Sequence, residues 1–136
     1  MKIMAIDFGD SRTGFAVSDA LGFSAQTLDA CKEKSFKKVA EYAAALSKDL
    51  CAEKIILGFP KNMNGTIGPR GEKTKRFANY LETLTEIPII LWDERLTTVS
   101  AHQLMNETNV RGKKRKNSVD SISAAYILQG YLDSIR

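Results

Sequence analysis

The sequence MAIDFGDSRTGFAVSD, residues 4–19, decides the fold, because it is typical of two short strands joined by a tight polar turn. The first strand is apolar from Ile3 to Phe8 except for Asp7. An unpaired charge buried in a core strand costs on the order of several kcal/mol, so we expect Asp7 either to open into a site at the strand end or to hold a cation. The alternative is that Asp7 only caps the turn, a role for which Asp10 is already available.

Length and composition indicate one globular domain, residues 1–136, without a membrane-spanning segment. No run approaches the ~20 apolar residues that a membrane helix needs. The chain reaches Asp7 too soon for a secretory signal, which predicts a cytoplasmic protein. Cys31 and Cys51 form no C-x-x-C pair, and His102 is the only histidine, so a zinc site is not expected.

Positive charge is concentrated in one short segment, residues 111–116. The formal net charge is +4, from 20 basic and 16 acidic residues, and five of the basic residues lie in this segment: Arg111, Lys113, Lys114, Arg115 and Lys116. Without them, the remaining 15 basic and 16 acidic residues leave a charge of −1. This pattern favours an arm that contacts a polyanion over a uniformly basic surface. The alternative is a solvated loop, which is what charge runs often are.

After the opening hairpin, the hydrophobic pattern predicts a third strand and then alternating helices and strands. The expected strands are residues 23–30, 54–59 and 88–92. The first expected helix is residues 35–50, and the second has an inward stripe made of Phe77, Ala78, Leu81 and Leu84. A third helix is expected to begin at Thr97 or Thr98, and the last is expected to run from Asn117 or Ser118 to Ile135. Right-handed crossovers lay the two later strands parallel to the first. We therefore expect an α/β fold in which helices flank a mixed five-stranded sheet, with three antiparallel strands followed by two parallel ones.

Acidic residues gather at the edge that the carboxyl ends of the first, fourth and fifth strands share. Asp7 ends the first strand, and Asp93 and Glu94 follow the fifth. Asp120 lies one turn before Ala124 on the apolar stripe of the last helix, so we expect it to point toward the sheet. The alternative for Asp120 is a favourable interaction with the helix dipole, worth roughly 0.3–1 kcal/mol.

Three carboxylates in close proximity repel one another unless a divalent cation neutralises them. Oxygen-only ligands favour Mg²⁺ or Mn²⁺, and two such ions about 3.5–4 Å apart suit phosphodiester hydrolysis by water. Alternation along the fifth strand puts Asp93 and Glu94 on opposite faces, so only one of them can join Asp7 and Asp120. We favour Glu94 for its longer reach, with Asp93 as the alternative ligand. The predicted activity is that of a metal-dependent nuclease.

Phosphate contacts are expected from basic side chains around the same edge: Arg12, Lys61, Arg70, Arg95 and the segment 111–116. Asn62 and Asn64 are candidates for hydrogen bonds to a sugar or a base. Each of the single cations has an alternative role as a surface residue that aids solubility.

Four motifs, taken in order, resemble the YqgF family, also called RuvX: DFGxxRTG (7–14), GFPKNMNG (58–65), DERLTT (93–98) and VDSxxAAxxL (119–128). This resemblance implies a ribonuclease H-like fold and a cytoplasmic bacterial nuclease, described as a Holliday junction resolvase and implicated in maturing the 5′ end of small-subunit ribosomal RNA. The family's acidic positions carry over to Asp7, to Glu94 with Asp93 beside it, and to Asp120. Two departures are mild, Phe59 in place of the usual Leu and Asn64 in place of the common Asp.

The leading hypothesis is an Mg²⁺- or Mn²⁺-dependent nuclease that acts on structured precursor RNA, with pre-ribosomal particles as possible partners and branched DNA as the alternative substrate. A four-way junction substrate would suggest a homodimer in place of a monomer. Two other classes remain open. One is a nucleotide-binding relative of the actin-like ATPases, which the short chain argues against. The other is a catalytically silent nucleic-acid-binding protein, which predicts salt-sensitive binding without metal-dependent products.

Overall fold

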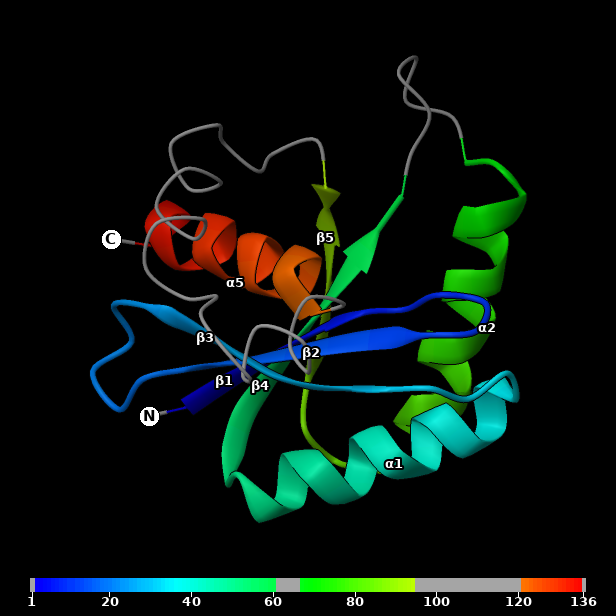
Figure 1. Ribbon diagram of the computed structural model, residues 1–136, viewed down its shortest axis with the longest axis horizontal. Coiled ribbons are helices and arrows are strands. Elements are labelled where there is room, and N and C mark those ends of the chain that lie inside the picture. The colour runs from blue at the N-terminus through cyan, green and yellow to red at the C-terminus, as the bar shows by residue number, and fades with distance from the viewer. Residues whose placement is uncertain (1, 61–66, 95–120, 136) are drawn as a thin grey trace.

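The computed structural model describes residues 2–60, 67–94 and 121–135, which form a five-stranded sheet with helices on both faces (Figure 1). The strands are β1 (Lys2–Asp7), β2 (Thr13–Ser18), β3 (Ala25–Cys31), β4 (Ala52–Phe59) and β5 (Ile89–Asp93), and the helices are α1 (Phe36–Asp49), α2 (Pro69–Glu82) and α5 (Ile122–Ser134). None of the helices in these ranges is long and apolar enough to cross a membrane.

The sheet has the strand order β3-β2-β1-β4-β5. Strand β2 pairs antiparallel with both β1 and β3, whereas β4 runs parallel to β1 and β5 runs parallel to β4. This confirms the expected mixed sheet. Because β1, β4 and β5 run in the same direction, their carboxyl ends at Asp7, Phe59 and Asp93 meet at one edge of the sheet, where open α/β sheets bind ligands.

Helix α5 covers one face of the sheet, on the opposite side from α1 (Figure 1). The side chains that β1, β2 and β3 present to α5 include the small residues Ala5, Ala16 and Ala25. Small side chains allow the helix backbone to approach the sheet closely. Leu128 and Leu132 of α5 complete this core and are almost fully buried.

Helices α1 and α2 pack against the other face, which is richer in large side chains. Met4, Ile6 and Phe15 point from the sheet into this second core, where they meet Phe77 and Leu81 of α2 and the inward stripe of α1. Aromatic pairs reinforce it, among them the stacked rings of Phe8 and Phe77, with centroids 4.4 Å apart. Since β1 contributes alternately to both cores, it is the strand around which the fold is built.

Helix α2 ends earlier than the sequence predicted. Leu84, expected on its inward stripe, lies past the end of the helix at Glu82 and is 39% exposed. The Thr83 hydroxyl donates a hydrogen bond of 2.6 Å to the carbonyl oxygen of Tyr80, and a local bond of this kind competes with continuation of a helix.

Two predictions for the last helix are also wrong. Its N-cap is Ser121 instead of Asn117 or Ser118, and Ile135 lies beyond the last helical residue and is 57% exposed. The expected third helix and residues 117–120 lie outside the described residues.

Candidate active site

Asp7 is the last residue of β1 and is the carboxylate that the sequence analysis singled out. Ile3 and Ala5 of the same strand face α5, so alternation along the strand turns Asp7 toward the α5 face as well. Burial raises the pKa of Asp7 above its ordinary value, and the positive charge of Arg70 partly offsets this effect. The fold therefore holds a carboxyl group at the sheet edge under conditions that disfavour its negative charge.

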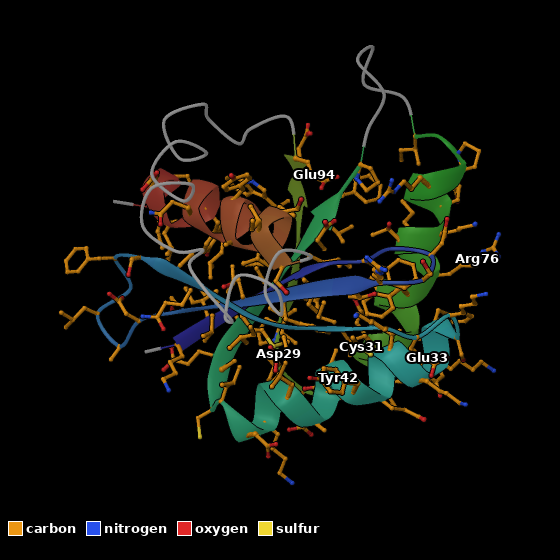
Figure 2. The ribbon with its side chains drawn as sticks, viewed as in Figure 1. Asp29, Cys31, Glu33, Tyr42, Arg76 and Glu94 are labelled. Atoms are coloured by element: carbon orange, nitrogen blue, oxygen red, sulfur yellow. The ribbon has the colours of Figure 1, made fainter. Side chains whose placement is uncertain are left out.

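Glu94 follows directly after β5, where Figure 2 labels it, and its side chain lies beside Gly58 of β4. Its Cγ and Oε1 atoms lie 3.4 Å from the point where a Cβ atom at Gly58 would stand. The same point lies against the Cδ1 atom of Ile127 in α5, which places Glu94 on the α5 face. Gly58 thus lacks a side chain where Ile127 of α5 packs directly over its backbone, with Glu94 in contact beside it.

Asp7 and Glu94 act on each other electrostatically. Burial raises the pKa of Glu94, the negative charge of Asp7 raises it further, and Arg70 again counteracts both effects. Because β1 neighbours β4 and β4 neighbours β5, the two carboxylates flank β4 from either side at the same edge. The structure therefore joins two of the predicted acidic residues on one face of the sheet.

Asp93 does not share this face. Ile90 and Trp92 of β5 pack against the α5 core, and Ile89 packs against the other core, so regular alternation directs Asp93 away from α5. Its charge still raises the pKa of Glu94, but as the weakest of the influences on that group. Asp93 and Glu94 thus lie on opposite faces of the sheet, as expected from the sequence. The role of either residue as a metal ligand stays a prediction.

Arg70 is the predicted cation whose place near the acidic pair is clearest. It lies in the first turn of α2, directly after Pro69, and its charge lowers the pKa of both Asp7 and Glu94. The first turn of α2 packs closely on the end of β4, because a Cβ atom at Gly71 would come within 2.6 Å of Cγ2 of Ile67 and 3.0 Å of the Pro60 carbonyl oxygen. Arg70 therefore supplies positive charge beside the carboxylates from a helix that packs on the opposite face.

The turn between β1 and β2 brings Arg12 to the same edge. A Cβ atom at Gly9 would collide with the carbonyl oxygen of Arg12, and the Gly9 amide donates a hydrogen bond of 3.4 Å to Oγ1 of the buried Thr13. Glycine at position 9 thus permits the sharp return of the chain after Phe8. Arg12 itself is exposed, as a phosphate contact must be.

The remaining candidates lie outside the described residues: Lys61, Asn62, Arg95, Arg111, Lys113, Lys114, Arg115, Lys116 and Asp120. Within the described ranges, no group of three or more His, Cys, Asp or Glu side chains forms a metal-binding cluster. The acidic pair is nevertheless made of the oxygen donors that Mg²⁺ and Mn²⁺ prefer.

Two residues that shape this site, Gly58 and Ser121, are not among the predicted site residues. Gly58 carries a recognisable signal, since an isolated glycine inside a strand often marks a close approach of other atoms. Ser121 belongs to the VDSxxAAxxL motif, but no local pattern there indicates which residue it contacts. Its buried hydroxyl accepts a hydrogen bond of 3.0 Å from the amide of Phe15, a residue 106 positions earlier in the chain.

Comparison with known proteins adds sequence relatives and structural neighbours. A family model described as "RuvX: Holliday junction resolvase" matches residues 1–134. A protein of Clostridium novyi (strain NT) named "Putative pre-16S rRNA nuclease" is 49% identical over 135 residues, covering 99% of this chain and 100% of the relative. A protein of the same name from Bacillus subtilis (strain 168) is 45% identical over 137 residues and covers 99% of both chains.

The structural neighbours are far more distant in sequence. The Thermus thermophilus RuvC structure superposes with a TM-score of 0.62 at 11% identity, covering 98% of this chain and 96% of the other. The fowlpox virus Holliday junction resolvase gives a TM-score of 0.59 at 14% identity, covering 98% and 99%. At this level of identity the likeness concerns the fold, which is that of the ribonuclease H-like resolvases.

Proposed function

Because the chain belongs to the RuvX family, we propose that it is a cytoplasmic nuclease that hydrolyses phosphodiester bonds in pre-16S rRNA during maturation of the 5′ end. The observation that supports this proposal best is the pairing of Asp7 with Glu94 beside Arg70 at the carboxyl edge of the sheet. A buried acidic pair next to a cation suits a reaction in which a phosphate must be bound and a water activated.

We propose that Asp7 and Glu94 hold Mg²⁺ or Mn²⁺, in a set of two ions completed by Asp120. The raised pKa values of the pair are what a bound divalent cation would reverse, and the donors are all oxygens. Bound ions would lower the pKa of a coordinated water and stabilise the leaving oxygen. Support for Asp120 comes from its neighbour Ser121, which hydrogen-bonds to Phe15 in the strand beside β1. Asp93 remains the alternative to Glu94.

The basic residues bind and orient the substrate strand in this proposal. Arg70 contacts the phosphate next to the acidic pair, and Arg12 contacts a phosphate across the β1–β2 turn. Lys61, Arg95 and the segment 111–116 extend the contacts along the backbone, and Asn62 hydrogen-bonds a sugar or a base. Binding that depends on several such cations weakens steeply as salt is added.

The test is to incubate the protein with precursor rRNA and with four-way junction DNA, each with Mg²⁺ and with Mn²⁺, and to map the ends produced. We expect metal-dependent cleavage of the RNA at the 5′ side. Asp7→Asn should lower the cleavage rate at least about 1000-fold, because it removes several kcal/mol of metal-assisted stabilisation. Asp29→Asn, which alters an exposed carboxylate on β3, is the matched control and should retain activity.

Binding of the metal is measured separately from cleavage. Mg²⁺ or Mn²⁺ should raise the melting temperature of the wild-type protein and of Asp29→Asn, and should raise that of Asp7→Asn much less. An equal shift in all three proteins would contradict the role given to Asp7.

Resolution of branched DNA is the second candidate, favoured by the description of the matching family. It predicts symmetrical cuts in the junction and a homodimer on the DNA, whereas RNA processing is compatible with a monomer. Salt-sensitive binding of either substrate, without metal-dependent products, would identify a silent nucleic-acid-binding protein and contradict the nuclease proposal.

A further inference from the structure

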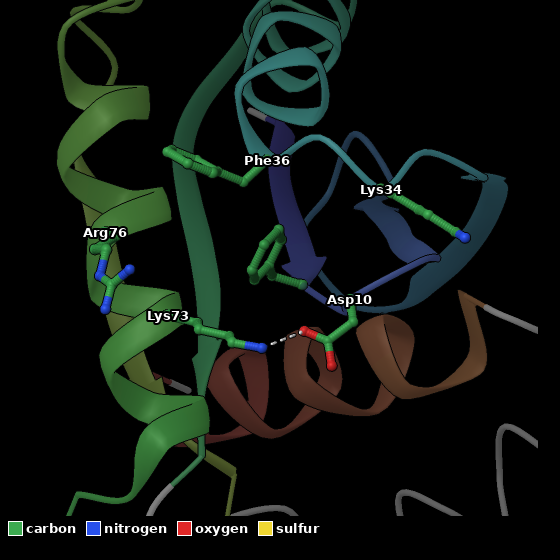
Figure 3. Close-up of a pocket in the computed structure, with 6 residues that line it drawn as sticks. Asp10, Lys34, Phe36, Lys73 and Arg76 are labelled. Atoms are coloured by element: carbon green, nitrogen blue, oxygen red, sulfur yellow. Dashed lines mark hydrogen bonds and ion pairs between the residues drawn. The ribbon is translucent and has the colours of Figure 1, made fainter.

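A hollow opens on the other side of the β1–β2 turn from the acidic pair, where α1 begins and beside α2 (Figure 3). It has a volume of about 480 Å³, within the roughly 300–1,000 Å³ range of small-molecule sites. Its lining combines aromatic rings and charged groups: Phe8, Asp10, Lys34, Phe36, Lys73 and Arg76. We call it the aromatic pocket.

The aromatic pocket and the acidic pair contain consecutive residues of the chain but lie on opposite faces of the sheet. Asp7 and Phe8 are consecutive, and consecutive residues at a strand end point to opposite sides of a sheet. The Phe8 ring accordingly stacks on Phe77 in the core under α2. A polymer that passes over the β1–β2 turn can therefore reach the acidic pair with one unit and the aromatic pocket with another.

The charges at the rim favour an anion. Lys73 of α2 is paired with Asp10 of the β1–β2 turn, with 3.3 Å between Nζ and Oδ1 (Figure 3). Within the part of the chain that the structure describes, Lys34 and Arg76 form no ion pair. These two cations lie on opposite sides of the pocket, with the Lys34 side chain directed away from Arg76 (Figure 3). Arg76 is the better phosphate ligand, because Arg binds a phosphate with two parallel hydrogen bonds.

The two rings are held in place by their neighbours. Phe8 is stacked on Phe77, and Phe36 meets Tyr80 of α2 edge to face, with centroids 5.9 Å apart. Both phenylalanines are half-buried, so part of each ring remains accessible. Fixed aromatic rings beside unpaired cations are the combination that binds nucleic-acid bases together with their phosphates.

We propose that the aromatic pocket binds one nucleotide, with its base against Phe36 and its phosphate at Arg76. Two sources provide this chemistry, an unpaired nucleotide of a bound strand and a free nucleoside monophosphate. The first source rests on the proposed function, because it makes the pocket an anchor for RNA that leads to the acidic pair. The second does not.

The test uses a short single-stranded RNA that contains 2-aminopurine, whose fluorescence falls when it stacks on an aromatic ring. Binding is measured without divalent metal, so that no cleavage takes place. We expect quenching with the wild-type protein, loss of most of the quenching with Phe36→Leu, and affinity about 5- to 150-fold lower, the range measured for removal of one stacked base. Arg76→Glu should also weaken binding and reduce its salt dependence.

Two matched controls separate the pocket from general effects. Phe23→Leu removes an exposed ring on the β2–β3 turn, and Lys48→Glu reverses a charge at the far end of α1. Both should bind and quench like the wild type. The proposal is overturned if wild-type protein gives no quenching, or if Phe36→Leu behaves like Phe23→Leu while thermal melts show that both variants are folded.

A second arm of the experiment distinguishes the sources. AMP that displaces the oligonucleotide at micromolar concentration, with the same dependence on Phe36, assigns the pocket to a free nucleotide; displacement only at millimolar concentration assigns it to a strand. The outcome is independent of the nuclease proposal, because wild-type protein that quenches without ever cleaving would leave the pocket in place and remove only the proposed activity.

Discussion

Under α5 the sheet presents Ala5, Ala16 and Ala25, whereas under α1 and α2 it presents Met4, Ile6 and Phe15. The first face therefore brings a helix close to the strands, and the second buries large apolar side chains between layers. The α5 face also carries Asp7 and Glu94, and it is the face that the fold positions with directional bonds.

Buried hydrogen bonds tie α5 to the β2–β3 part of the sheet. The Phe15 amide donates to Oγ of Ser121, and the Ala25 amide donates to Oε1 of Gln129 at 3.2 Å. The Gln129 amide group in turn donates to the carbonyl oxygen of Phe23 at 3.2 Å. Buried polar groups of this kind specify one arrangement, because any shift of the helix would leave them unsatisfied.

The two faces of the sheet contribute differently: one positions the acidic pair, and the other contributes most to the stability of the fold. The α1/α2 face gains most from burying large side chains, which is non-directional. On the α5 face, burial raises the pKa of Asp7 and Glu94, and buried polar groups hold α5 in one position over the acidic pair. Mutations of the acidic pair on the α5 face should therefore lower mainly the cleavage rate, whereas mutations on the α1/α2 face should lower mainly the free energy of unfolding.

The strongest test replaces each of the two adjacent acids at the end of β5, one at a time, by its uncharged amide. Glu94→Gln should lower the cleavage rate at least about 1000-fold, because it removes a carboxylate on the α5 face and several kcal/mol of metal-assisted stabilisation. Asp93→Asn, on the opposite face, should lower it less than about tenfold. Single-turnover cleavage at saturating metal measures both. A larger loss with Asp93→Asn would transfer the ligand role to Asp93.

The second test removes apolar volume on the α1/α2 face. Leu81→Ala should lower the free energy of unfolding by about 2–5 kcal/mol, because Leu81 is fully buried in that core. The cleavage rate of the folded variant should stay within a few-fold of the wild type, since the acidic pair lies on the other face. Urea unfolding and cleavage at low temperature measure the two quantities. Leu84→Ala, at a position 39% exposed, is the control and should cost less than about 0.5 kcal/mol.

Much of this division could be predicted from the sequence, because it follows from local patterns. One acid inside an apolar strand points to Asp7, and alternation along the fifth strand predicts that Asp93 and Glu94 lie on opposite faces. Right-handed crossovers predicted that β1, β4 and β5 would share an edge, and the observed sheet confirms it.

What escaped prediction depends on contacts between distant parts of the chain. The hydrogen bond of Ser121 to Phe15 replaces a helix cap, and no local pattern near Ser121 reveals its partner. The aromatic pocket likewise forms only where the β1–β2 turn, the start of α1 and the middle of α2 meet. Helix ends were misjudged because apolar residues such as Leu84 continue the helical period after the helix has stopped.

The third test adds a side chain on β4, beside Glu94. Gly58→Ala should lower the free energy of unfolding by about 1–3 kcal/mol, because the new Cβ atom would collide with Cδ1 of Ile127. The cleavage rate should stay within a few-fold of the wild type, because Glu94 lies at ordinary contact distance, 3.4 Å, from the new atom. Adding Ile127→Val removes the Cδ1 atom and should restore stability. A large loss of activity that Ile127→Val does not reverse would mean that the new Cβ atom displaces Glu94.

The smallest effect concerns pH and tests the electrostatic difference between the faces. The pKa of Asp7 is raised in the folded protein by burial, so the folded state retains a proton that the unfolded chain has already lost. The contribution of the Asp7 carboxyl group to the free energy of unfolding of the metal-free protein should therefore be largest below about pH 4. It should fall as the pH rises through the raised pKa of Asp7. The slope from one carboxyl group cannot exceed about 1.4 kcal/mol per pH unit. Glu94 adds a contribution of the same sign, weakened by its exposure to solvent.

Urea unfolding in EDTA between pH 4 and 8 measures this contribution as the difference between the wild type and Asp7→Asn. The variant has no carboxyl group to ionise at position 7, so it should become more stable relative to the wild type as pH rises. Mg²⁺ should cancel that advantage at pH 8, because a bound cation favours the ionised carboxylates that burial disfavours. Asp29→Asn should follow the wild-type curve throughout. A wild-type stability that rose with pH in EDTA, relative to Asp7→Asn, would mean that Arg70 outweighs burial at Asp7 and that the acidic pair is already balanced without a metal.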